Sequence, residues 1–344
     1  MKNYMIMCMA VLAIMLSSCK NEDISISREV TINVNPYTVV KDFAKYEYNP
    51  GDFSTVWWYD LGDRLRVQLF VYDSKGNLVE SEVSYLENYS STMNVRCSLA
   101  GGSYSVIAVT DEVGLAGTQV TDEYWFTTGT ERLSYLKVAP NPDWSDGGFK
   151  KLGITSQSIL VDASHSTFTV DVKPAGAMIQ SWIYNIHGFS DVMEYSLWMN
   201  RKNGNFSFDE AGQYSVGYEQ VNYTRCLRLD EPKDYTASNI YSYNFIVPYG
   251  NTGFRWEVVL DDNNLYTFLQ EEYVNIQAGK SYGCILDIDG SNSTFSFGEL
   301  DDSKGTYMSE KDAMENVSTN YKRQSKMEST KSEIVRSIEV NVLK

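Results

Sequence analysis

Residues 99–109 read LAGGSYSVIAV, and residues 276–286 read IQAGKSYGCIL. Both stretches contain the core Ala-Gly-x-Ser-Tyr followed by an apolar run. Glycine supplies the positive φ of a tight turn, which a side chain would resist. The tyrosine then opens a run whose alternate residues can face a core, as they do in a β-strand. The repeat therefore predicts two similar β-domains, each closed by a tight turn and a late strand.

Elsewhere the chain alternates apolar and polar residues with a period of two, which is typical of half-buried strands. The pattern covers residues 30–34, 65–71, 93–99, 168–172, 241–247 and 254–260. The sequence DSKGN at residues 73–77 predicts a hairpin with Gly76 in the left-handed conformation, and Asn203-Gly204 predicts another across residues 197–208. No segment of helical period reaches the usual length with caps, so the predicted fold class is all-β.

Composition sets the broad class of protein. The chain has 344 residues, of which 43% are apolar and 22% charged, enough for two folded domains of ordinary size. Its 25 tyrosines favour strands over helices. A formal charge of −16 argues against nucleic acid or anionic lipid as a partner, since both attract basic patches.

The N-terminus has the pattern of an export signal. Lys2 is followed by an apolar run over residues 5–16 that is too short to span a bilayer, and then by the sequence LSSC ending at Cys19. Small residues before a cysteine resemble the bacterial lipobox. We expect a lipoprotein signal peptide at residues 1–18, a lipid on Cys19 and an acidic tether at residues 19–27, with an ordinary secretory signal as the alternative.

The tether contains the sequence KNED at residues 20–23, which is similar to the short tag that sends lipoproteins of the Bacteroidetes to the cell surface. The expected location is therefore the cell outer membrane, lipid-anchored and surface-exposed.

The rest of the chain divides into three parts. We expect an N-terminal β-sandwich at residues 28–162, a C-terminal β-sandwich at residues 163–290 that begins with the alternating strand near Val170, and a polar tail at residues 291–344. Near its end the tail has a detached strand whose apolar residues share one phase, broken only by Arg336: Ile334, Ile338, Val340 and Val342. A detached strand needs a sheet edge, which either another subunit or its own domain can offer.

Three cysteines remain outside the export signal: Cys97, Cys226 and Cys284. They lie far apart and form no C-x-x-C pair, so they do not make a disulfide framework. Cys97 and Cys284 occupy the apolar phase of strands, which predicts buried free thiols. One disulfide among these three cysteines is the alternative.

Nothing in the sequence predicts catalysis. His165 and His187 have no spacing that suggests a zinc site or a nucleophile triad, and adjacent acidic pairs are expected among 45 acidic residues. We therefore expect no enzyme activity, no metal and no cofactor. The aromatic residues Trp57, Trp58 and Trp125 could form a platform that stacks on sugars, so the alternative function is a surface glycan-binding lipoprotein.

Four segments carry a resemblance to a known family. They read LRVQLFVYDSKGNLV at residues 65–79, LAGGSY at 99–104, YNFIVP at 243–248 and IQAGKSY at 276–282. Together with the lipobox they resemble the fimbrillin-like superfamily, and most of all the fimbrial anchor subunits of Bacteroidetes. The resemblance implies two tandem transthyretin-like β-sandwich domains.

The resemblance also implies a lipid-anchored fimbrial subunit without catalysis, whose partners are other fimbrial subunits. In this family one subunit's strand is inserted into a groove of its neighbour, and the strand at residues 334–343 is the candidate donor. Shaft pilins of the family are trimmed at a basic residue, for which Arg28, Lys41 and Lys45 are available here, whereas anchor subunits are not trimmed. Anchor, shaft and tip roles stay open.

Overall fold

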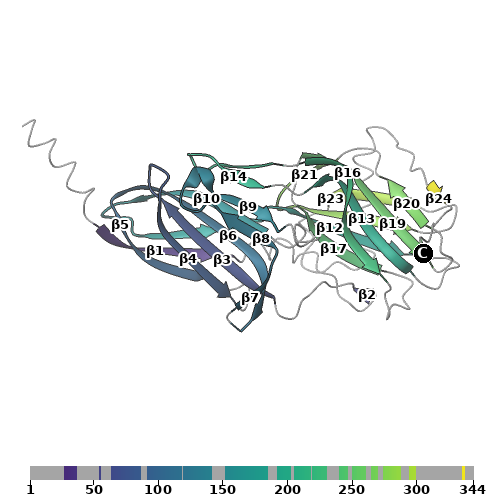
Figure 1. The fold of residues 1–344 in the computed structure, drawn as a ribbon, viewed down its shortest axis with the longest axis horizontal. Helices are drawn as coiled ribbons and strands as arrows, with labels where there is room; N and C mark the ends of the chain where they lie inside the picture. Colours follow the sequence, from purple (N-terminus) through teal and green to yellow (C-terminus); the bar gives the residue numbers. More distant parts are fainter. Residues whose placement is uncertain are drawn as a thin grey trace, which may run out of the picture.

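The strands of this chain form several β-sheets, in two groups that follow each other along the longest axis (Figure 1). The computed structural model describes residues 27–36, 54–55, 63–86, 91–117, 119–141, 152–184, 192–202, 205–217, 219–230, 240–246, 250–260, 265–269, 274–287, 294–299 and 335–337. Within these residues the only helix is a single 3-10 turn, η1 (Leu133–Tyr135). The predicted all-β class is confirmed.

The first group contains a three-stranded sheet in the order β11-β1-β5. Its strands are β1 (Ser27–Asn35), β5 (Met93–Ala100) and β11 (Thr167–Asp171). The central strand β1 runs antiparallel to β5 and parallel to β11.

A larger sheet in the order β10-β6-β3-β4 lies against the first, with β7 attached to β6. Its strands are β3 (Asp63–Tyr72), β4 (Leu78–Leu86), β6 (Gly102–Ala116), β7 (Gln119–Glu123) and β10 (Leu152–Val161). The predicted hairpin at residues 73–77 joins β3 to β4, and Gly76 has a φ of 74°. That prediction is confirmed.

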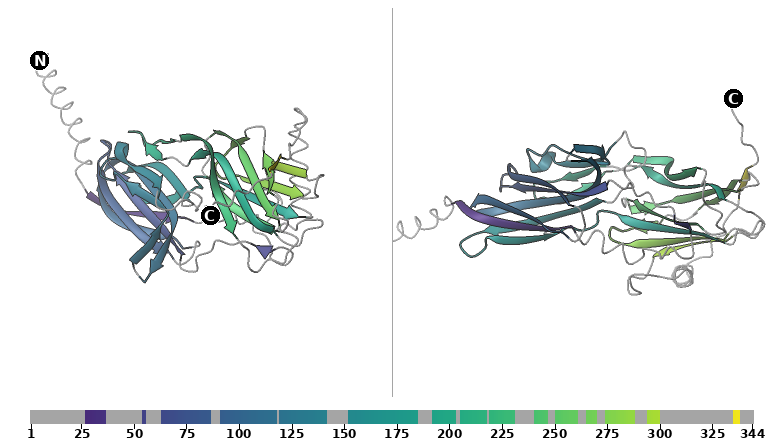
Figure 2. Two further views of the ribbon diagram at one scale, coloured as in Figure 1. Left: turned by 45° about the vertical axis from the view of Figure 1, so that its right-hand side comes forward. Right: turned by 90° about the horizontal axis from the view of Figure 1, so that it is seen from below.

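A third sheet covers the other face of the β10-β6-β3-β4 sheet. It has the order β15-β14-β9-β8, with β8 (Trp125–Thr128), β9 (Lys137–Pro140), β14 (Phe206–Phe208) and β15 (Tyr214–Val216). The view from below in Figure 2 shows the strands of this group stacked in layers. Because the middle sheet is buried on both faces, β6 has an unbroken apolar run, Val106 to Val109, instead of simple alternation.

The second group has two five-stranded sheets. One has the order β2-β17-β12-β22-β23, with β2 (Ser54–Thr55), β12 (Ala177–Tyr184), β17 (Ile240–Ile246), β22 (Ser281–Asp287) and β23 (Thr294–Glu299). The other has the order β16-β13-β19-β20-β24, with β13 (Val192–Lys202), β16 (Glu219–Asp230), β19 (Phe254–Leu260), β20 (Leu265–Leu269) and β24 (Val335–Ser337). The short strands β18 (Gly250–Thr252) and β21 (Val274–Ile276) pair with each other.

Aromatic rings connect the two sheets of the second group. The ring centroid of Phe297 in β23 lies 5.6 Å from that of Phe254 and 5.7 Å from that of Trp256, both in β19. The Trp256 indole N–H donates to Ser181 Oγ of β12 at 3.3 Å. Sheets that share buried rings in this way pack face to face.

Both copies of the repeated turn change sheets. The first leads from β5 into β6, and the second leads from β21 into β22, so each delivers the chain into a strand with neighbours on both sides. Glycine has a positive φ in both turns, 156° at Gly102 and 75° at Gly279, as predicted.

Two strands lie elsewhere than the sequence predicts. The alternating strand near Val170, expected to open the C-terminal sandwich, is β11, which pairs with β1 and contributes Val170 to the first core. The hairpin predicted at Asn203-Gly204 is wrong, because β13 pairs with β16 and β19 while β14 pairs with β9 and β15. Burial decides both placements. Val170 lies in the first core, and Phe206 and Phe208 lie in the core beside β8 and β9.

Candidate functional site

The first strand, β1, is held in a slot between two strands from distant parts of the chain. Its register matches Ile32 with Val95 of β5 on one side and with Phe168 of β11 on the other. The three inward side chains, Val30, Ile32 and Val34, are each 0% exposed. Burying a side chain of this kind stabilises the fold by about 1.5–3 kcal/mol. The slot therefore accepts a strand with apolar residues at three alternate positions.

Polar contacts fix β1 at both ends. The Asn35 amide donates to Asp171 Oδ1 at 2.9 Å, and the Thr92 hydroxyl donates to Asn35 Oδ1 at 2.9 Å. At the other end the hydroxyl oxygens of Ser27 and Ser98 lie 2.7 Å apart. These contacts fix the register of β1, since a shift by one residue would also turn its apolar side chains outward.

Two neighbouring strands of the first group pair on one side only. In the part of the chain that the structure describes, β5 pairs with β1 alone and β4 pairs with β3 alone. A strand at the edge of a sheet presents free backbone N–H and C=O groups, which can bind another strand. These two edges are the candidate functional site.

The C-terminal strand lies in another sheet. Residues Val335–Ser337 form β24, which pairs antiparallel with β20, so β1 and β24 do not share a slot. The four residues chosen as the candidate donor, Ile334, Ile338, Val340 and Val342, lie outside the described residues.

The export and trimming residues are only partly described. Arg28 lies within β1 itself, opposite Leu99 of β5. Cys19, Lys41 and Lys45 lie outside the described residues. Cleavage at Arg28 would require this end of β1 to leave its sheet, because a protease needs an exposed extended segment.

The structure contradicts the predicted sugar-stacking platform at Trp125. Trp125 is 0% exposed, and its ring packs against Phe206 at a centroid distance of 6.2 Å. A ring buried on all sides cannot stack on a sugar. Trp57 and Trp58 lie outside the described residues. Among the described residues, the large exposed aromatic side chains are Tyr85, Tyr135 and Tyr214, which sequence alternation alone does not distinguish from buried ones.

Several ionisable groups among the described residues make structural contacts. Glu123 contacts the buried guanidinium of Arg66, although the sequence suggests a solvated surface carboxylate. His165 Nδ1 lies 2.9 Å from Asp162 Oδ1 in an exposed turn. Cys97 and Cys284 are buried free thiols, as predicted, and burial raises the pKa of Cys284 well above its ordinary value. Within the described part of the chain, no three His, Cys, Asp or Glu side chains lie close enough together to hold a metal ion.

The structure gives no candidate for a membrane-crossing helix within its described ranges, because no helix there is both long and apolar enough.

Comparison with solved structures finds similar folds among surface proteins of Bacteroidetes, at low identity. The tip fimbrial protein Mfa3 of Porphyromonas gingivalis is 10% identical with a TM-score of 0.45, over 80% of this chain and 100% of that one. A candidate polysaccharide-binding protein of Bacteroides thetaiotaomicron is 12% identical with a TM-score of 0.46, over 82% and 99%. A fimbrial assembly protein of Parabacteroides distasonis is 10% identical with a TM-score of 0.36, over 81% and 97%.

No protein-family model matches the chain, and no curated protein matches its sequence. Identities this low do not transfer residue roles from one protein to another.

Proposed function

We propose that this protein is a lipid-anchored cell-surface fimbrial subunit that associates with other subunits by strand addition and catalyses no reaction. Signal peptide 1–18 would be removed, and Cys19 would carry the lipid at the outer membrane. The candidate donor is the strand at residues 334–343, and the acceptor is a free strand edge of a neighbouring subunit.

The pair of free edges at β4 and β5 is the observation that supports this proposal most directly. Strand addition satisfies backbone groups that an edge leaves unpaired, and alternate side chains of the added strand fill apolar positions. The tail has the required alternation. Exposed edges with apolar surroundings are otherwise a risk of aggregation, so a defined partner explains why they persist.

Removal of the tail tests the donor role. Cells expressing the chain without residues 332–344 are expected to lose the fimbrial subunits that copurify with the full chain. A sharper variant replaces Ile338 and Val340 with Asp, which places charge on the apolar phase, while its matched control replaces Glu339 and Asn341 with Ser on the opposite phase. Assembly that survives both the truncation and the aspartates contradicts the proposal.

Lipid attachment is tested separately. A Cys19→Ala variant is expected to lose incorporation of a labelled fatty acid and to leave the membrane fraction, whereas Cys8→Ala is expected to retain both. Labelling that persists in Cys19→Ala contradicts the anchor.

A further inference from the structure

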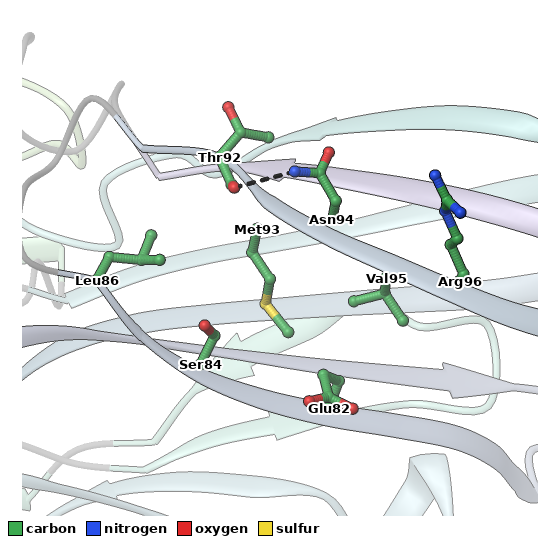
Figure 3. Close-up of a pocket in the computed structure, with 8 residues that line it drawn as sticks. All are labelled: Glu82, Ser84, Leu86, Thr92, Met93, Asn94, Val95 and Arg96. Carbon is green, nitrogen blue, oxygen red and sulfur yellow. Dashed lines mark hydrogen bonds between the residues drawn. The ribbon is translucent and has the colours of Figure 1, made fainter. Parts of the chain in front are cut away.

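A groove of about 350 Å³ lies between the free edges of β4 and β5 (Figure 3). Alternate residues of β4 form one wall, and the start of β5 with the residue before it forms the other. The lining residues are Glu82, Ser84, Leu86, Thr92, Met93, Asn94, Val95 and Arg96. Figure 3 shows Met93 and Val95 pointing toward β4, above Ser84 and Glu82.

The opposite seam between the same two sheets is bridged. There the Thr155 hydroxyl of β10 donates to the carbonyl oxygen of Asp171 at 3.0 Å, and the Thr155 hydroxyl oxygen accepts from the Lys173 N–H at 2.9 Å. Of the strands that the structure describes, none bridges β4 and β5 in this way. Among the described strands, the sandwich is bridged at the β10–β11 seam and open at the β4–β5 seam.

The open seam reaches the apolar core. Met93, Val95 and Cys97 of β5 are 4%, 5% and 7% exposed, whereas the inward residues of β1 are all 0% exposed. Leu86 packs against the same core from β4 and is only partly buried. An added strand with apolar side chains would complete the burial of this row.

Two carboxylates lie on the groove side of β4. Glu82 lines the groove, and Glu80 precedes it on the same face of the strand. Burial and then the charge of Glu80 raise the pKa of Cys97 in β5. Two copies of β4 paired antiparallel would bring glutamates together, and like charges opposite each other are unfavourable. Pairing with β4 of a second copy is thus disfavoured. Because Arg96 lines the β5 side of the groove, its acidic side is the β4 wall, which favours a strand that turns a basic residue toward β4 among apolar ones.

We propose that the β4–β5 groove receives residues 334–342 from a second copy of this chain. This inference rests on the proposed strand addition. The added strand runs antiparallel to β5 and extends the β11-β1-β5 sheet. In this register Arg336 faces Glu82, Ile338 faces Ser84 and Val340 faces Leu86, so the single basic residue in the apolar phase meets the carboxylate of the β4 wall.

The β1 slot is the competing acceptor. Entry there requires β1 to leave, which would expose three side chains that are now 0% exposed and break pairing with both β5 and β11. Filling the β4–β5 groove requires no strand of the acceptor copy to leave, and the donor copy gives up only the three-residue pairing of β24 with β20. An untrimmed chain therefore offers the groove, because filling it breaks no pairing in the acceptor.

Peptide binding tests the register. A labelled peptide of residues 332–344 is added to the full chain, and its anisotropy is measured. Glu82→Lys is expected to weaken binding about tenfold, and a peptide carrying Arg336→Glu is expected to restore it on that variant. Glu210→Lys, an exposed acid on the turn between β14 and β15, is the matched control and should bind as the unmodified chain does.

Cross-linking tests the location. Copies carrying Ser84→Cys are mixed with copies carrying Ile338→Cys, and a disulfide-linked dimer is expected on oxidation; Ser81→Cys, on the opposite face of β4, should give none. Peptide binding that is insensitive to Glu82→Lys, with no cross-link at position 84, overturns this inference and leaves strand addition elsewhere intact. Absence of any peptide binding overturns both this inference and the proposed strand addition.

Discussion

The Tyr104 hydroxyl donates a hydrogen bond to the carbonyl oxygen of Ala100 at 2.8 Å, across the first of the two repeated turns. In the second turn the Gln277 N–H donates to the Tyr282 hydroxyl oxygen at 3.1 Å. The tyrosine that ends each Ala-Gly-x-Ser-Tyr sequence therefore folds back on its own turn. The hydroxyl thus adds to each turn a hydrogen bond that a purely apolar side chain could not make.

Removing the hydroxyl should weaken this closure. We expect Tyr104→Phe to lower the free energy of unfolding by about 1 kcal/mol, because the partly buried carbonyl of Ala100 loses this hydrogen bond. Tyr85→Phe, on an exposed face of β4, should leave it unchanged. Urea denaturation followed by circular dichroism measures both, and equal stability of the two variants would contradict this role.

The buried guanidinium of Arg66 joins β3 to β6. Its Nε donates to Asp111 Oδ1 at 2.8 Å and its Nη2 donates to Asp111 Oδ2 at 2.7 Å. Arg66→Leu should cost about 3–5 kcal/mol, because the wholly buried Asp111 loses its counter-charge. Replacing Arg66 and Asp111 together by Leu should recover part of that loss. A double variant less stable than Arg66→Leu in urea would argue against the pairing as the cause.

The turn between β3 and β4 should make stability depend on pH. Asp73 Oδ1 accepts from the backbone N–H of Lys75 at 2.8 Å and of Asn77 at 2.9 Å. Burial raises the pKa of Asp73, but hydrogen bonds from Asn77 and Lys75 and the charge of Lys75 together lower it more, so the pKa lies below its ordinary value. A carboxyl with a depressed folded-state pKa stabilises the fold above its unfolded pKa and loses this effect as pH falls through the folded value.

The unmodified chain should therefore exceed Asp73→Ala by about 1 kcal/mol in the free energy of unfolding at pH 7. The difference should shrink below about pH 4. Urea titrations of both chains at a series of pH values measure it, and a difference that stays constant down to pH 3 would exclude the ionised carboxyl as its source.

The hairpin formed by β14 and β15 should hold residues 206–216 on the first group of sheets. Phe206 is 0% exposed and packs against Trp125, so Phe206→Ala should cost about 3–5 kcal/mol. Tyr135→Ala, at a side chain that is 54% exposed, is the matched control and should be nearly neutral. Limited proteolysis should then cut near residue 210 faster in Phe206→Ala, and equal rates would contradict this anchoring.

The sequence by itself determined the all-β class, most of the alternating strands and the turn between β3 and β4. Alternation separates Val30, Ile32 and Val34 from their polar neighbours, and the DSKGN sequence specifies a hairpin, because side-chain direction and turn geometry depend on residues close together in the chain.

Only the tertiary structure decided which sheet covers each face. β11 pairs with β1, Phe206 enters the first core and Trp125 is buried, although no local pattern distinguishes these outcomes. Arg66 lies on the face of β3 that reads as polar, and it is buried because a third sheet covers that face. The open seam at β4 and β5 likewise depends on strands distant in sequence, since an edge is free only when no other strand pairs with it.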